Sequence, residues 1–322
     1  MSKKILVTGG LGFIGTNLIQ KLLKTTDDSF IILDAQMYKG ALNNLPRDTS
    51  FKKRITFIGG DITKKKNVEK VVEQVQVIIH LAASTHTATS FKKPTDFIKT
   101  NVIGTARLLD AAFKYSVDRF IYISSSEVYG NRQKHEKMDE KHPFAPISPY
   151  AVTKLAADRL VYSYHLTKKL PVVILRPFNT YGPYQQTEKM IPLFISRLLK
   201  NLPITLNMGG KQKRDWVFID DHLRAIEAVL NATDSKVHGE SFNIGTGRSV
   251  STKEVALLIL KALNKSRDLL KIDYGSIPGT LGNVGVSKKA EMVLGWRHKV
   301  SLEEGIAKTV AWYKNNIRWW DK

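Results

Sequence analysis

The sequence contains no cysteine and no long apolar run, and each absence excludes a class of protein. Without cysteine there is no disulfide, zinc–thiolate centre or thiol nucleophile, which fits a protein of the reducing cytoplasm. No stretch approaches the roughly 18–20 apolar residues of a membrane-spanning helix. The apolar stretch near the start covers only residues 5–7. This is too short for a signal peptide, so we expect neither a membrane span nor secretion.

Acidic residues are few relative to basic ones, 29 against 50 among 322 residues, giving a net charge of +21. The lysines occur in small groups dispersed along the chain, such as 64–66 and 92–93. A nucleic-acid binder would gather them on one face or arm, often with aromatic residues between them. We therefore expect no nucleic-acid partner, and a basic surface that attracts small polyanions such as sugar nucleotides.

Short apolar runs rich in β-branched residues alternate with helix-like stretches over about 175 residues. Such runs suit strands buried on both faces of a parallel sheet, and the alternation predicts a doubly wound, Rossmann-like α/β fold. The predicted strands cover residues 5–7, 30–33, 56–58, 77–80, 120–123 and 172–175. The predicted helices cover residues 16–24, 96–115, 150–166, 190–199, 221–230, 252–263 and 302–313.

The texture changes after Pro183, where helical stretches are separated by short strands and Gly/Pro turns. We predict a first domain over residues 1–180 and a smaller C-terminal domain, mainly for substrate, over residues 181–322. Residues 215–246 are expected to fold back onto the first domain.

A glycine pattern, Gly9-x-x-Gly12-x-x-Gly15, follows the first predicted strand and opens a helix. Such glycines permit a tight turn, close approach of the backbone to a pyrophosphate and close packing of helix on strand. The phosphates then lie at a helix N-terminus, which favours anions. Asp34 follows Gly15 by 19 residues, at the end of the second strand. A carboxylate there suits ribose hydroxyls and repels a 2′-phosphate, which predicts NAD rather than NADP.

Two further segments fall at strand ends, where the ligand crevice of such a sheet lies. They are Asp61-Ile62 and Leu81-Ala82-Ala83, and the small residues of the second would let a cofactor approach the backbone. The predicted cofactor site comprises Gly9, Gly12, Phe13, Ile14, Gly15, Asp34, Asp61, Ile62, Leu81, Ala82, Ala83, Tyr150 and Lys154.

Tyr150 and Lys154 are one helical turn apart and therefore share a helix face. We expect the ammonium group to stabilise the phenolate and so to lower the pKa of Tyr150. A phenolate beside a nicotinamide can remove a hydroxyl proton while hydride leaves the same carbon. A serine-rich strand end, 124–126, lies about 25 residues upstream.

Together these features resemble the extended short-chain dehydrogenase/reductase superfamily, specifically its nucleotide-sugar branch, over essentially the whole chain. Within that branch several segments look most like the dTDP-glucose 4,6-dehydratases. These segments are 179–184, 188–192, 214–216, 294–296 and 312–313.

The resemblance implies catalytic roles for Tyr150, Lys154, Ser125, Ser126 and Glu127. In the family, the hydroxyl at the position of Ser125 binds the sugar near C4, and the Glu at the position of Glu127 removes the C5 proton. An Asp usually protonates the departing C6 hydroxyl, but this chain has Ser126 there, and a serine is a far weaker acid. GDP-mannose 4,6-dehydratases and UDP-glucuronate decarboxylases also carry Ser-Glu here, whereas simple 4-epimerases usually lack the Glu.

The resemblance also implies a substrate site formed by His86, Asn179, Lys189 and Arg214, with Lys189 and Arg214 on the diphosphate. The chain departs from the family in two segments. Segment 86–90 lacks an acid and a base that the family places near the substrate, and loop 278–283 lacks the usual diphosphate-binding Arg. The histidines show no metal-ligand spacing, so no metal is expected.

The resulting hypothesis is an NAD-dependent nucleotide-sugar 4,6-dehydratase that acts through a 4-keto intermediate with internal return of hydride. A nucleotide-sugar 4-epimerase, which would leave Glu127 idle, stays open. So does a UDP-glucuronate decarboxylase-like enzyme, which would need an Arg for the substrate carboxylate. A dinucleotide-sensing protein is disfavoured because Ser125, Tyr150 and Lys154 are all present. The resemblance further implies a homodimer formed by helices 96–115 and 150–166.

Overall fold

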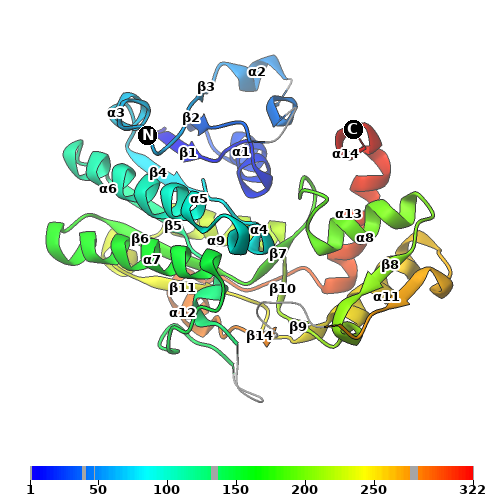
Figure 1. The fold of residues 1–322 in the computed structure, drawn as a ribbon. Helices are drawn as coiled ribbons and strands as arrows, with labels where there is room; N and C mark the ends of the chain where they lie inside the picture. Colours follow the sequence, from blue (N-terminus) through cyan, green and yellow to red (C-terminus); the bar gives the residue numbers. More distant parts are fainter. Residues whose placement is uncertain (1, 38–40, 47, 132–136, 276–281, 322) are drawn as a thin grey trace.

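The structure, a computed structural model, describes residues 2–37, 41–46, 48–131, 137–275 and 282–321 (Figure 1). Its centre is a seven-stranded parallel sheet with the order β11-β6-β5-β4-β1-β2-β3. The strand order reverses between β1 and β4, where a doubly wound sheet opens its ligand crevice. The Rossmann-like fold predicted from the sequence is confirmed. The strands are β1 (Lys4–Thr8), β2 (Ser29–Asp34), β3 (Ile55–Gly59), β4 (Val77–His80), β5 (Arg119–Ile123), β6 (Val172–Pro177) and β11 (Ser241–Ile244).

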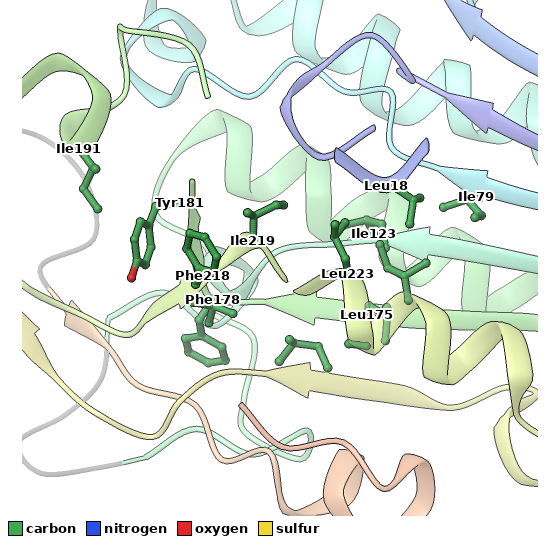
Figure 2. Packing of buried hydrophobic residues seen from close by; sticks show 14 of the residues in the cluster. Leu18, Ile79, Ile123, Leu175, Phe178, Tyr181, Ile191, Phe218, Ile219 and Leu223 are labelled. Atoms are coloured by element: carbon green, nitrogen blue, oxygen red, sulfur yellow. The ribbon is translucent and has the colours of Figure 1, made fainter. Parts of the chain in front are cut away.

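Apolar side chains cover both faces of this sheet. On one face, Leu18 of α1 (Phe13–Thr25) and Leu223 of α9 (Ile219–Asn231) lie with Ile123 in a single buried cluster (Figure 2). On the other face, α3 (Lys65–Val72), α6 (Thr105–Lys114) and α7 (Pro149–Lys168) supply the buried cluster. Burial on both faces explains why these strands read as continuous apolar runs.

The helix predicted over residues 96–115 is not a continuous α-helix. It consists of α5 (Pro94–Phe97), a π-helical segment η2 (Ile98–Gly104) and α6. Asn101, within η2, exchanges hydrogen bonds with Ser84 and also donates to the Thr153 hydroxyl at 3.0 Å. These long-range bonds give the segment partners that helical periodicity does not reveal, and π-helical turns often occur at functional sites.

Three helices of the C-terminal part, α8 (Met190–Leu199), α11 (Thr252–Leu263) and α13 (Leu302–Asn315), pack on one another. Their positions agree with the predicted helices, with α13 extended by two residues. Small sheets lie beside them: β7 with β10, β8 with β13, and β9 between β12 and β14. These strands are β7 (Asn179–Tyr181), β8 (Ile204–Leu206), β9 (Lys213–Arg214), β10 (Trp216–Phe218), β12 (Val250–Ser251), β13 (Leu270–Ile272) and β14 (Gly282–Asn283).

The segment 215–246 runs between the two parts of the chain. Its helix α9 contacts α1, and its strand β11 adds to the central sheet beside β6.

The remaining short elements are η1 (Ala41–Asn44), α2 (Thr49–Lys52), α4 (Thr87–Lys92), η3 (Ser126–Tyr129), η4 (Asn207–Gly210), α10 (Asp234–Val237), η5 (Arg267–Leu269), α12 (Lys288–Leu294) and α14 (Ile317–Trp320). Among the described residues, no helix has the length and apolarity required to cross a bilayer.

Candidate active site

The glycine loop between β1 and α1 leaves no room for side chains at two of its glycines. Gly9 has a positive φ of 68°, and a Cβ there would lie 2.8 Å from the backbone of Ala82. A Cβ at Gly15 would lie 2.5 Å from the carbonyl oxygen of Gly9. Gly12 caps α1 without a side chain, and the first turn holds no acidic residue. The helix N-terminus is therefore suited to an anion, as a dinucleotide pyrophosphate requires.

Asp34 ends β2 with its carboxylate fixed by two backbone amides. Its Oδ2 accepts from Leu11 at 3.0 Å and its Oδ1 accepts from Gln36 at 2.7 Å. Burial raises the pKa of Asp34, and these two hydrogen bonds act in the opposite direction. The carboxylate is held next to the glycine loop, where ribose hydroxyls of a dinucleotide would be bound.

The other predicted cofactor residues differ in what their side chains do. The amide of Ala82 donates to the Thr8 hydroxyl at 3.3 Å, which holds the end of β4 against β1. Asp61 accepts from the amide of Thr63 at 2.8 Å and so shapes its own turn. Ile62 is buried in the core, so that a cofactor could meet only its backbone.

Tyr150 and Lys154 lie in the first turns of α7, which Ser148 caps by accepting from the Ala151 amide at 3.1 Å. The Nζ of Lys154 donates to the carbonyl of Ile123 at 2.5 Å and lies 4.4 Å from the centroid of the Tyr122 ring. Burial lowers the pKa of Lys154 to about 7, and Asp158 acts in the opposite direction. The lysine is thus held between α7 and the end of β5.

The expected lowering of the Tyr150 pKa by Lys154 is not what the structure shows. Burial raises the pKa of Tyr150, the carboxylate of Glu127 raises it further, and only a hydrogen bond with Ser125 lowers it. The reason is that the Lys154 ammonium is directed to a backbone carbonyl, while the phenol is enclosed beside a carboxylate.

Ser125, Ser126 and Glu127 lie where β5 passes into η3, but their side chains have different surroundings. The hydroxyl of Ser125 accepts a hydrogen bond from the Glu127 amide at 3.2 Å and is also hydrogen-bonded to the side chain of Tyr150. Ser126 is 2% exposed and accepts from the side-chain amide of Asn283 at 3.0 Å. Burial raises the pKa of Glu127, whereas Arg214 and Lys189 lower it. Glu127 therefore interacts electrostatically with Tyr150 and with two cations.

Two of the four residues predicted to bind substrate, Lys189 and Arg214, interact electrostatically with this carboxylate. Lys189 donates to the carbonyl of Thr85 at 3.0 Å, and burial lowers its pKa while Glu188 and Glu127 raise it. Burial likewise lowers the pKa of Arg214, whereas the carboxylate of Glu127 raises it. Lys189 and Arg214 thus both interact with Glu127, and two cations close to one carboxylate agree with a binding site for a polyanion.

His86 and Asn179 already have partners in the fold. The Nδ1 of His86 caps α4 through the Thr89 hydroxyl at 2.6 Å and amide at 3.3 Å. Asn179 donates to the carbonyl of Asp215 at 3.2 Å and to the Oδ1 of Asn283 at 3.1 Å. Residues 278–281 of the loop expected to lack an Arg lie outside the described residues, and its last residues, Gly282 and Asn283, form β14 beside Arg214.

Sequence reasoning missed a buried network behind Lys154. Asp158 is fully buried and accepts from Arg176 at 2.9 and 3.0 Å. Burial raises the pKa of Asp158, but the hydrogen bonds and charge of Arg176 hold it below its usual value. Arg176 also donates to the hydroxyl of Tyr129, at the end of η3. The one available signal was the i, i+4 spacing of Lys154 and Asp158 on a predicted helix.

The fold, the glycine loop after β1 and the Tyr-Lys pair of α7 define an extended short-chain dehydrogenase/reductase. Within that class the chain belongs to the GDP-mannose 4,6 dehydratase family, whose model matches residues 6–309. The predicted superfamily and branch are confirmed.

Curated relatives in the family include dTDP-glucose 4,6-dehydratases from distant organisms. The enzyme of Streptomyces antibioticus is 35% identical over 98% of this chain and 94% of its own length. The enzyme of Mus musculus is 39% identical over 99% of this chain and 91% of its own length.

Solved structures similar to this chain include both a dehydratase and an epimerase that act on sugar nucleotides. The dTDP-glucose 4,6-dehydratase DesIV from Streptomyces venezuelae, crystallised with NAD and TYD bound, superposes with a TM-score of 0.91 at 34% identity, covering 99% of both chains. The UDP-glucose 4-epimerase of Thermotoga maritima, crystallised with UDP-glucose, gives 0.90 at 29% identity, covering 98% of this chain and 99% of its own. NAD in the DesIV structure agrees with the cofactor predicted from Asp34.

Proposed function

We propose that this protein is an NAD-dependent nucleotide-sugar 4,6-dehydratase, most similar to the dTDP-glucose 4,6-dehydratases. The observation that carries the proposal is the carboxylate of Glu127, which interacts electrostatically with Tyr150 and with the two cations Arg214 and Lys189. A 4-epimerase needs only the tyrosine, because its chemistry is confined to C4. A second base next to the tyrosine is what removal of a C5 proton requires.

Tyr150 and Ser125 act on the sugar at C4. When bound, NAD would supply the acceptor for the C4 hydride and the donor of that hydride to C6 in the same turnover. Because burial and Glu127 raise the pKa of Tyr150, the tyrosine can take the proton of the C4 hydroxyl only when a positive charge, such as that of an oxidised nicotinamide, stabilises its phenolate. Ser125, hydrogen-bonded to Tyr150, orients the same oxygen. Lys154 fixes the geometry by linking α7 to the end of β5.

Glu127 acts one carbon further along the sugar. The C4 ketone acidifies the C5 proton, which the ionised Glu127 removes. Arg214 and Lys189 favour the ionised form, since each lowers the pKa of Glu127. Once protonated, Glu127 gives this proton to the C6 hydroxyl, which leaves as water. The hydride from C4 is added at C6, and the proton that Tyr150 took from the C4 hydroxyl passes to C5 and replaces the one removed there. Ser126 is too weak an acid for this step and supplies a hydrogen bond instead.

The test is to incubate the protein with a panel of sugar nucleotides and to read the products by mass. A dehydratase yields a product lighter by one water. An unchanged mass with altered stereochemistry indicates the epimerase, and loss of CO₂ indicates the decarboxylase. Tightly bound NAD without turnover of any substrate would identify a sensor protein and contradict the proposal.

The 4-epimerase remains the second candidate because of one observation. Ser126 stands where an acid is expected, and its oxygen is engaged by Asn283 rather than left to the substrate alone. The nucleotide base and the hexose are decided by the same panel.

We also propose that the protein is a homodimer. Five large apolar side chains of the neighbouring elements η2, α6 and α7 are 42–52% exposed: Ile98, Ile103, Phe113, Val152 and Leu166. Exposed apolar patches of this kind favour association. Val152→Glu should convert a dimer into a monomer at micromolar concentration, as measured by light scattering, and a monomeric wild-type protein would contradict this proposal.

We further propose that the two parts of the chain bind different ligands. We assign NAD binding to residues 1–180 and sugar-nucleotide binding mainly to residues 181–322, with 215–246 joining the first part through β11. We assign the protein to the cytoplasm, where sugar nucleotides and NAD are available, and cell fractionation tests this.

A further inference from the structure

The C-terminal helix α14 and the end of α13 form an aromatic cluster with Tyr184. We define the C-terminal aromatic cluster as Tyr184, Trp312, Tyr313, Trp319 and Trp320. The ring centroids of Trp312 and Trp319 are 5.0 Å apart, and that of Tyr184 is 4.6 Å from Trp312 and 5.8 Å from Trp319. Edge-to-face and tilted contacts at such distances stabilise the arrangement of the rings. The cluster thus gives the short helix α14 a fixed position, which Figure 1 places on the same side of the molecule as α2.

One member of the cluster reaches into the cofactor-binding part of the chain. The Nε1 of Trp319 donates to the Oδ1 of Asn44 at 2.6 Å. Asn44 is 6% exposed, and its Nδ2 donates to the carbonyl of Leu11 at 3.0 Å. Leu11 lies inside the glycine loop, and its amide donates to the Oδ2 of Asp34 at 3.0 Å. Trp319 is therefore connected to the glycine loop and to Asp34 by three consecutive hydrogen bonds.

A second contact joins the segment next to the cluster to α1, the helix that follows the glycine loop. The Nδ2 of Asn17, in the second turn of α1, donates to the carbonyl of Pro183 at 2.9 Å and to that of Phe13 at 2.8 Å. Pro183 precedes Tyr184, which has a positive φ of 64° although it is not glycine. A tyrosine in this conformation is held there by its surroundings, here the rings of Trp312 and Trp319.

We propose that Trp319 is a positioning residue for the dinucleotide site: through Asn44 it fixes the Leu11 peptide, and so sets the affinity for the cofactor. The inference rests on the proposed function, since it assumes that NAD occupies the glycine loop.

The Leu11 residue is fixed at both its amide and its carbonyl. Its amide is fixed by Asp34 and its carbonyl by Asn44, so the peptide that leads into Gly12 and the first turn of α1 has one orientation. The amides of that turn are the groups that face a pyrophosphate. If the Trp319 bond is lost, the buried Oδ1 of Asn44 loses the one hydrogen-bond partner that it has among the described residues, and the carboxamide is free to rotate away from Leu11. The loop must then pay an ordering cost when the cofactor binds.

The experiment compares Trp319→Phe with Trp320→Phe. Both replace one indole of the cluster by a phenyl ring and remove one hydrogen bond. The Nε1 of Trp320, however, donates to the carbonyl of Tyr313 at 2.9 Å, within the cluster and without a connection to Asn44. Each variant is stripped of cofactor, and its dissociation constant for NAD is measured by calorimetry. Hydrogen exchange of residues 9–15 is measured in the absence of NAD.

We expect Trp319→Phe to raise the NAD dissociation constant about three- to tenfold, the usual effect of one hydrogen bond, and to accelerate exchange in residues 9–15. Trp320→Phe should change neither. The kcat at saturating NAD and the KM for the sugar nucleotide should be those of the wild type in both variants. In an Asn44→Ala background, Trp319→Phe should have little further effect, because the two residues act through one path.

Two results would overturn the inference. Equal NAD affinities of Trp319→Phe and Trp320→Phe, or equal effects of Trp319→Phe with and without Asn44→Ala, would show that the indole bond does not act on the loop. A wild-type protein that binds no NAD would overturn the proposed function together with this inference. A wild-type protein that binds NAD while the Trp319 variant is unaffected would overturn this inference alone.

Discussion

The side-chain amide of Asn283 donates to the hydroxyl of Ser126 at 3.0 Å, and both side chains are buried. The Oδ1 of Asn283 in turn accepts from Asn179, so that three residues from η3, β14 and β7 form one chain of hydrogen bonds. Ser126 and the loop that ends at Asn283 are two places where the sequence departs from the family pattern. The two departures thus meet in one buried contact, and this contact holds Ser126 as a hydrogen-bonding group.

Ser126→Ala tests whether the serine has a catalytic or a structural effect. We expect turnover to fall by less than tenfold, because a serine hydroxyl contributes little as an acid. The free energy of unfolding should fall by about 1–3 kcal/mol, because the buried amide of Asn283 loses its partner. Steady-state kinetics and urea unfolding measure the two effects. A drop in turnover of 10³-fold with unchanged stability would instead identify Ser126 as a proton donor, and Ser126→Asp would then preserve or raise the rate of elimination.

Glu127→Gln should separate C4 oxidation from elimination. The amide cannot take the C5 proton, so turnover should fall about 10²–10⁴-fold. Oxidation at C4 still proceeds, and the near-ultraviolet absorbance of reduced nicotinamide should accumulate on mixing with substrate. Glu73→Gln, which changes an exposed carboxylate directly after α3, is the matched control and should turn over normally. Wild-type turnover by Glu127→Gln would show that C5 is not the reacting centre and would favour the 4-epimerase.

Removing the charge of Arg214 should shift the pH dependence of catalysis. Burial raises the pKa of Glu127, and Arg214 is the first of two cations that lower it. In Arg214→Met this pKa therefore rises, and because the base must be ionised, the acid limb of the kcat profile moves to higher pH. Measurement at saturating substrate separates this shift from weaker binding. Arg214→Lys retains the charge and should keep the wild-type limb, and identical limbs in all three proteins would exclude the electrostatic role.

The fold was predictable because its signals are local. Apolar runs define six of the seven strands of the central sheet, and Gly9 and Gly15 are needed because a side chain there would collide with backbone atoms. Tyr150 and Lys154 were found in the same way, since a helical turn fixes their spacing. Each of these inferences needs only a few neighbouring residues.

The contacts that were missed join distant parts of the chain. Ser126 and Asn283 are 157 residues apart, and Asn44 and Trp319 are 275 residues apart. No periodicity or spacing connects such pairs. The direction of the Tyr150 pKa was also mispredicted, because the helical spacing of Lys154 does not reveal that its ammonium donates to the carbonyl of Ile123.

The stability of the protein should depend on the protonation of His222 in acid. This histidine of α9 is fully buried with its Nδ1 3.1 Å from the hydroxyl of Thr180, and burial lowers its pKa from 6.5 to about 4. Between these values the unfolded chain binds a proton that the folded protein does not, so the free energy of unfolding falls as pH falls from 6.5 towards 4. In His222→Asn this contribution is absent, and the slope should be smaller by up to about 1.4 kcal/mol per pH unit. Urea unfolding at several pH values measures the slope, with His298→Asn, at an exposed position, as the control that keeps the wild-type value. An unchanged slope in His222→Asn would show that this imidazole is protonated in the folded protein as readily as in the unfolded chain.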